Sequence, residues 1–204
     1  MRKPKIWLFM AFLLLAAGCG GTAETAVYEP VAGCDGQLYP NPADSPYVLP
    51  FAAGESYSTG LTNCSSSYHG PGQPDQYAYD FDMPVGTTFT AARAGTVFKV
   101  VADAPSSGGG AGNYVIIDHQ DGTYGLYYHS PQDGIAVQVG DEVAQGDPLG
   151  ITGRSGLAGY PHLHFIVVAG NPDYPYNGQA ISFSNAQPAD VPLQSRTVYE
   201  AATP

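Results

Sequence analysis

A long run of alternating apolar and polar residues between Thr88 and Val168 most constrains what this chain can fold into. Its clearest part is NYVIIDHQDGTYGLYYHS, where Asp121 and Gly122 form a turn signal between two arms with a period of two. The stretches TFTAARAGTVFKVVAD, IAVQVGDEVAQGDPLGITG and PHLHFIVV also indicate short strands joined by tight turns. The sequence therefore predicts an all-β, antiparallel domain, with a further late strand near AISFS, residues 180–184.

The stretch PHLHFIVV places two of the five histidines one residue apart. On a strand, His162 and His164 project to one face, whereas Leu163, Phe165 and Val167 project to the other. A polar outer face is the simple interpretation of such a pattern. Paired imidazoles beside a packed apolar face favour a metal or catalytic site instead.

Other side chains that bind metals or carry protons lie upstream of this pair. Asp80 and Asp82 are spaced by two and share a face of their own strand, and the remaining histidines are His69, His119 and His129. One aspartate and two histidines around zinc, with water in the fourth position, make a complete hydrolase centre. Because the chain has no HExxH motif, proton transfer falls to histidines that do not bind the metal. Spacing alone does not assign each histidine to its role.

The N-terminus has the pattern of an export signal. A basic start, MRKPK, precedes an apolar run of about 12 residues, which suits a signal peptide better than a membrane span. The run ends in LAAGC, which resembles a bacterial lipobox, so we expect cleavage before Cys19 and acylation of its new N-terminus. A plain cleaved signal is the alternative. The sequence thus predicts an exported protein, anchored by lipid to the bacterial membrane and facing the periplasm or cell wall.

Two cysteines remain after lipidation, and the balance of charge is strongly acidic. Cys34 and Cys64 lie in a compartment that permits oxidation, so we expect a disulfide between them. The full chain has 7 basic and 18 acidic residues and a formal net charge of −11; losing the three signal-peptide cations makes it −14. This balance argues against nucleic acid as a partner.

The chain shows no internal repeat and no second domain. We predict a signal peptide over residues 1–18, a tether and N-terminal segment over 19–47, a domain over 48–170 and a C-terminal tail over 171–204 that packs on the domain. We expect a monomer.

Three blocks in order, YDFDMPVGTTFTAARAGTVFKV, GNYVIIDHQDGTYGLYYHS and VQVGDEVAQGDPLGITGRSGLAGYPHLHFIV, resemble the lysostaphin-type, or LytM-domain, zinc endopeptidases that hydrolyse cell walls. The resemblance covers about residues 49–168 and implies a LytM-like sheet with an active-site groove and one Zn²⁺ per chain. It implies that Asp80 and His164 bind zinc, and that His162 and His129 act in catalysis.

One position departs from the pattern of that family. Many members carry the remaining zinc ligand four residues before the aspartate, where this chain has Gln76. Relatives with a lead-in similar to VLPFAAGESYS supply it from a loop farther upstream, and YHGPGQPDQYAYD resembles that arrangement. His69 is then the third ligand. Asp75 and Asp82 are the alternative donors, and a degenerate site without metal is the other interpretation.

The predicted function is a lipid-anchored zinc metalloendopeptidase that cuts peptide bonds in peptidoglycan. The competing prediction is a catalytically inactive LytM-fold lipoprotein that binds wall peptide or activates a partner hydrolase. The retained HxH pair, the YxH histidine and the aspartate favour the enzyme. His119 resembles a structural strand residue and is left out of the site.

Overall fold

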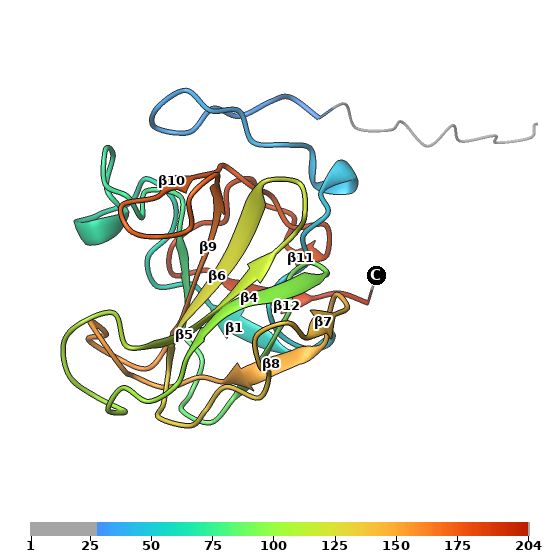
Figure 1. Ribbon diagram of the computed structural model, residues 1–204. Coiled ribbons are helices and arrows are strands. Elements are labelled where there is room, and N and C mark those ends of the chain that lie inside the picture. Colours follow the sequence, from blue (N-terminus) through green and yellow to red (C-terminus); the bar gives the residue numbers. More distant parts are fainter. Residues whose placement is uncertain (1–27, 204) are drawn as a thin grey trace, which may run out of the picture.

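The computed structural model describes residues 28–203 and is built almost entirely of β-strands (Figure 1). Within this range the helical elements are two short 3-10 turns, η1 (Pro42–Asp44) and η2 (Ser67–His69). No helix among the described residues has the length and apolar character needed to cross a membrane. The predicted signal peptide and Cys19 lie outside the described residues. The all-β prediction is confirmed for the part of the chain that the structure describes.

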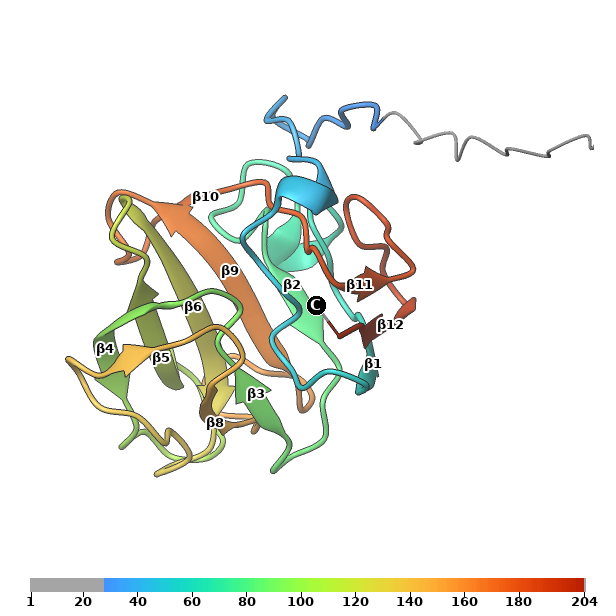
Figure 2. The ribbon, with the colours of Figure 1, turned by 90° about the vertical axis from the view of Figure 1, so that its right-hand side faces the viewer.

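The main sheet is antiparallel and carries the site. Its strands follow the order β10-β9-β6-β5-β4-β7, and β2 pairs with β9 beside this path. Figure 2 shows β2, β9 and β6 side by side. The strands of this sheet are β2 (Tyr79–Phe81), β4 (Gly95–Val101), β5 (Asn113–Asp118), β6 (Thr123–Ser130), β7 (Glu142–Val143), β9 (Leu163–Ala169) and β10 (Asn177–Gly178).

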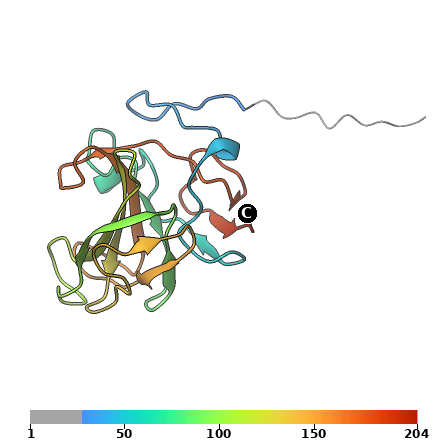
Figure 3. The ribbon, with the colours of Figure 1, turned by 45° about the vertical axis from the view of Figure 1, so that its right-hand side comes forward.

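Two smaller sheets complete the domain. One has the order β1-β12-β11, so that the C-terminal strand pairs with an early one, as Figure 3 shows in red and blue-green. The other is the antiparallel pair β3-β8. Their strands are β1 (Ser56–Ser58), β3 (Thr88–Thr90), β8 (Pro148–Ile151), β11 (Ala186–Gln187) and β12 (Val198–Ala201).

The two faces of the main sheet differ in what covers them. Leu163, Phe165 and Val167 of β9 point into the large apolar core. The opposite face carries a small apolar cluster, which includes Ile166 and Val168, and beside it the polar residues His162 and His164. The alternation expected from PHLHFIVV therefore places both imidazoles on the face away from the main core.

The hairpin between β5 and β6 forms as the sequence predicts, with its turn over residues 119–122. The expected late strand is wrong, because residues 180–184 form no strand in the structure. Ile181 and Phe183 are instead buried as separate apolar contacts to the core. The late strands are β11 and β12. They pair with each other, and β12 also pairs with β1, which is far away in sequence.

Candidate active site

The centre of the site is built on two adjacent strands. Asp80 of β2 pairs in register with His164 of β9, so both side chains leave the same face of the sheet at the same height. His164 Nδ1 lies 2.9 Å from Asp80 Oδ1. His69 Nε2, from η2, lies 3.3 Å from the same oxygen. One carboxylate oxygen and two imidazole nitrogens thus converge on one point.

The outer nitrogens of both imidazoles face fixed acceptors. His69 Nδ1–H donates to the carbonyl of Ala78 at 3.0 Å, and His164 Nε2 lies 3.4 Å from Asp75 Oδ1. Asp75 also accepts a hydrogen bond from the Tyr176 hydroxyl. Partners of this kind set the orientation of a metal-binding imidazole and leave its inner nitrogen free for a metal.

Two further histidines border the same point. His162 Nδ1–H donates to the Tyr160 carbonyl at 2.8 Å, and its Nε2 lies 3.6 Å from Asp80 Oδ1. His129 Nδ1–H donates to the Ser155 carbonyl at 2.8 Å. The rings of His129 and His162 lie 4.6 Å apart between centroids. Each ring therefore keeps one nitrogen free beside the centre.

A β-bulge brings His129 to this face. Tyr128 pairs with Tyr114 while Ser130 pairs with Asn113, so His129 is the extra residue on β6. Its φ of 79° lies in the left-handed region. Regular alternation would point His129 toward the core, as it does Tyr127. The bulge re-aims the side chain toward the centre instead.

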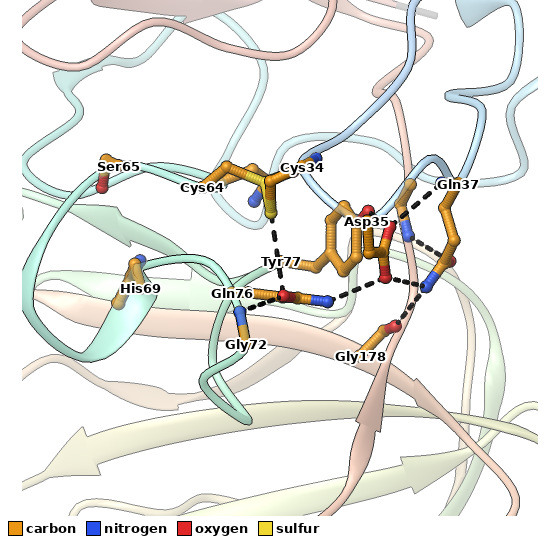
Figure 4. Close-up of a disulfide and its surroundings, with 12 residues drawn as sticks. Cys34, Asp35, Gln37, Cys64, Ser65, His69, Gly72, Gln76, Tyr77 and Gly178 are labelled. Carbon is orange, nitrogen blue, oxygen red and sulfur yellow. Dashed lines mark hydrogen bonds between the residues drawn. A yellow bond between two sulfur atoms is a disulfide. The ribbon is translucent and has the colours of Figure 1, made fainter.

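His69 lies on a loop that is closed at its base. The backbone N–H of Cys64 donates to the carbonyl of Gln76 at 2.7 Å. Cys64 also forms a disulfide with Cys34 of the N-terminal segment. Figure 4 shows His69 on the loop that leads away from this disulfide. Two connections, one covalent, thus fix the end of the loop from which His69 reaches the sheet.

Gln76 points away from the centre and stabilises the same loop. Its Oε1 accepts from the backbone N–H of Gly72 at 2.8 Å, and its Nε2 donates to Asp35 Oδ2 at 2.9 Å (Figure 4). Asp35 also accepts a hydrogen bond from the Tyr77 hydroxyl. The residue at the common ligand position of the resembled family is therefore a structural one here.

The five central side chains are buried and strongly coupled. Burial opposes the charged form of Asp80, yet the adjacent His164 and His69 hold the pKa of Asp80 well below its usual value. Burial also opposes a charged His164, but Asp75 and Asp80 raise its pKa to about 10. For His129, burial and the neighbouring histidines lower the pKa to about 3, and burial lowers that of His162.

Two sets of three side chains offer donor atoms within 4.8 Å of one another, namely His69, Asp80 and His164, and His129, His162 and His164. The first set includes a carboxylate, which offsets part of the charge of a divalent cation, and both of its outer imidazole nitrogens are oriented. Two imidazoles and one carboxylate are a donor set that suits zinc. The residues present therefore fit a zinc ion.

The structure also places the remaining candidates. His119 lies apart from the centre, where its Nδ1–H donates to the Ala94 carbonyl at 3.0 Å. Asp82 lies just beyond the end of β2, and its carboxylate accepts a hydrogen bond from the Ser58 hydroxyl at 2.6 Å. Asp75 lies behind His164 rather than at the centre. The sequence did not indicate Tyr176, since it comes from the tail and no motif includes it.

The comparisons with known proteins identify the family to which the chain belongs. The sequence model of Peptidase family M23 matches residues 75–181, just over half of the chain. Peptidoglycan DD-endopeptidase ShyA of Vibrio cholerae is 32% identical over 117 residues, which are 57% of this chain and 23% of ShyA. Lysostaphin of Staphylococcus simulans is 36% identical over 89 residues, which are 44% of this chain and 17% of lysostaphin. The matched region is thus less than a quarter of either relative.

A solved structure shows the same fold. The deep-sea M23 metalloprotease pseudoalterin superposes with a TM-score of 0.50 at 20% identity, over 71% of this chain and 81% of that one. At this level of identity the likeness concerns the fold alone.

Proposed function

Because this chain belongs to peptidase family M23, we propose that it is a zinc metalloendopeptidase that hydrolyses peptide bonds in bacterial cell-wall peptidoglycan. The observation that carries the proposal is the set of three imidazole nitrogens within 3.6 Å of Asp80 Oδ1, with the ring of a fourth histidine against them. So many buried polar side chains around one point are costly unless they bind something.

His69, Asp80 and His164 would hold one zinc ion per chain. Zinc bound there supplies Lewis-acid activation of a water molecule and of the scissile carbonyl. Asp75 and the Ala78 carbonyl keep the two ligand imidazoles in the orientation that binding needs.

His129 and His162 would carry out the proton transfers. Each donates its Nδ1–H to a backbone carbonyl, which leaves the Nε2 lone pair free to accept a proton. With two such rings 4.6 Å apart, one takes a proton from the attacking water on its Nε2, and the other, in its protonated form, donates its Nε2–H to the carbonyl oxygen on which charge develops. Both roles need the imidazoles beside the metal rather than bound to it.

The cellular setting is part of the proposal. The basic and apolar N-terminus and LAAGC favour export, with a lipid on Cys19 that anchors the protein to the bacterial membrane on its periplasmic or wall side. The proposed organisation is a signal over residues 1–18, a tether and N-terminal segment over 19–47, the peptidase domain over 48–170 and a packing tail over 171–204, in a monomer.

Metal content measured together with wall digestion tests the function. We expect about one zinc per chain after dialysis of the purified protein, a fall in the turbidity of purified cell walls, and new amino termini in the released peptides. Removal of zinc by a chelator should stop the release, and added zinc should restore it. Stoichiometric zinc without any cleavage would support the inactive binding module instead.

A further inference from the structure

The described part of the chain has four lysine and arginine side chains, and they fall into two groups. Arg93 lies 2.8 Å from Asp121, and Lys99 lies 3.0 Å from Asp173. The other two, Arg154 and Arg196, are exposed and form no ion pair within residues 28–203. In so acidic a chain, two free guanidinium groups need an explanation.

Arg196 lines a hollow of about 620 Å³ beside the centre, together with Gly60, Ser66, Asp82 and Tyr160. The hollow borders the active site directly. The Tyr160 ring lies 4.6 Å from the His162 ring between centroids, and the backbone N–H of Gly60 donates to the carbonyl of Asp80 at 2.8 Å.

Arg154 lines a second hollow, of about 550 Å³, together with Tyr68, Ser107, Gly156 and Leu157. This hollow borders other parts of the centre. Tyr68 directly precedes the ligand His69, and the residue after Arg154 is Ser155, whose carbonyl holds the His129 ring. The two hollows share no lining residue, and each includes residues next to those of the centre.

The backbone fixes each arginine while its guanidinium stays available. Arg154 donates only its Nε–H, to the Ala158 carbonyl at 3.2 Å. Arg196 has a φ of 62°, and its backbone N–H donates to the Thr59 carbonyl at 2.7 Å. In both residues the terminal N–H groups have no protein acceptor among the described residues.

Asp82 places a carboxylate in the wall of the Arg196 hollow. Its Oδ2 accepts from Ser58, and its Oδ1 is fully enclosed, next to Gly60 and the Tyr160 hydroxyl. The Asp82 oxygens therefore point into the wall, and the guanidinium of Arg196 is the ionic group that the hollow presents to a ligand.

We propose that Arg154 and Arg196, each in a hollow beside the metal centre, bind carboxylates of the substrate, so that the preferred substrate is an acidic peptide with free carboxylates near the scissile bond. A guanidinium matches a carboxylate with two parallel hydrogen bonds. The inference rests on the proposed peptidase function and selects acidic stem peptides over neutral oligoglycine.

The test compares two cross-linked peptides that differ only in their free carboxyl groups, which are intact in one and converted to carboxamides in the other. Wild-type kcat/KM should be about tenfold or more higher for the acidic peptide, mainly through KM, and the ratio should fall as salt rises. Arg154→Gln and Arg196→Gln should each lower this ratio by about three- to tenfold. The double variant should bring it close to one.

Lys99→Gln is the matched control, because it removes an exposed cation that lines neither hollow, and it should leave the ratio unchanged. Equal cleavage of both peptides by the wild type, or an unchanged ratio in the double arginine variant, would overturn the inference. If the zinc-loaded wild type cleaves neither peptide nor walls, the proposed function fails. Fluorescence anisotropy of the labelled peptides on the same protein then tests the carboxylate sites alone. Tighter binding of the acidic peptide would support them, and equal or tighter binding of the carboxamide form would reject them.

Discussion

The candidate metal centre has two halves that are held in different ways. Asp80 and His164 lie on neighbouring strands and are placed by the register of the sheet. His69 lies on a loop and reaches the same point from outside the sheet. The sheet half depends on a ladder of backbone hydrogen bonds over a large apolar core. The loop half depends on a few specific contacts.

Those few contacts come from segments far apart in sequence. The Cys34–Cys64 disulfide spans 30 residues, and the Gln76 side chain connects the loop to Asp35. The difference teaches that two of the proposed ligands are positioned by secondary structure, whereas the third is positioned by cross-links. Changes in the sheet half should therefore affect the whole site, whereas changes around the loop should leave Asp80 and His164 in place.

The largest effect is expected from His164→Ala. This change removes a proposed metal ligand and leaves Asp75 and Asp80 facing each other without the imidazole between them. Zinc content after dialysis and wall-digesting activity should both fall to background. Thermal unfolding identifies any loss of the fold, and a variant that keeps both zinc and turnover would contradict the sheet-borne ligand.

His69→Ala should abolish zinc retention while the fold is kept, because the side chain comes from a loop and not from the core. Metal analysis of the dialysed protein measures the loss. His119→Ala is the matched control, since it removes a buried histidine outside the centre and should keep its zinc. Stoichiometric zinc in His69→Ala would show that the loop half is dispensable.

His129→Ala and His162→Ala should keep zinc and lose turnover, which separates catalysis from metal binding. Loss of a proton-transfer group lowers the rate by about 100- to 10,000-fold. Single-turnover cleavage of a defined peptide, with metal analysis of the same samples, measures both quantities. Near wild-type turnover in His162→Ala would mean that the HxH pair is structural.

Asp75→Asn should weaken zinc binding by about 10- to 100-fold, because it removes the carboxylate behind His164 Nε2. Competition with a chelator of known affinity gives the ratio of dissociation constants. Asp82→Asn is the control, since Asp82 contacts Ser58 instead of a ligand. An equal loss in both variants would argue against a positioning role for Asp75.

The double variant Cys34→Ser and Cys64→Ser should have the smallest effect on zinc. Opening a crosslink of this size lowers the free energy of unfolding by roughly 3–4 kcal/mol. With the sheet ligands intact, zinc affinity should fall less than in Asp75→Asn. Denaturant unfolding with and without zinc measures both changes. Complete loss of zinc from a folded variant would show that the disulfide alone positions the loop that carries His69.

The same two halves explain how much the sequence could predict. Alternation in PHLHFIVV was sufficient to place His162 and His164 on one face, since strand geometry has a fixed period. His129 could not be placed this way, because alternation directs it into the core and only the bulge turns it out. Local patterns also contain no information on Tyr176, which reaches Asp75 from 101 residues away.

Gln76 has a consequence for how such a centre can change during evolution. Replacing it with histidine would not simply restore the commoner ligand pattern, because the change removes the amide that joins Gly72 to Asp35. The loop carrying His69 would loosen before the new imidazole had a place at the metal. A chain that moves the third ligand to this position therefore has to replace the contacts of the Gln76 amide as well as to gain an imidazole.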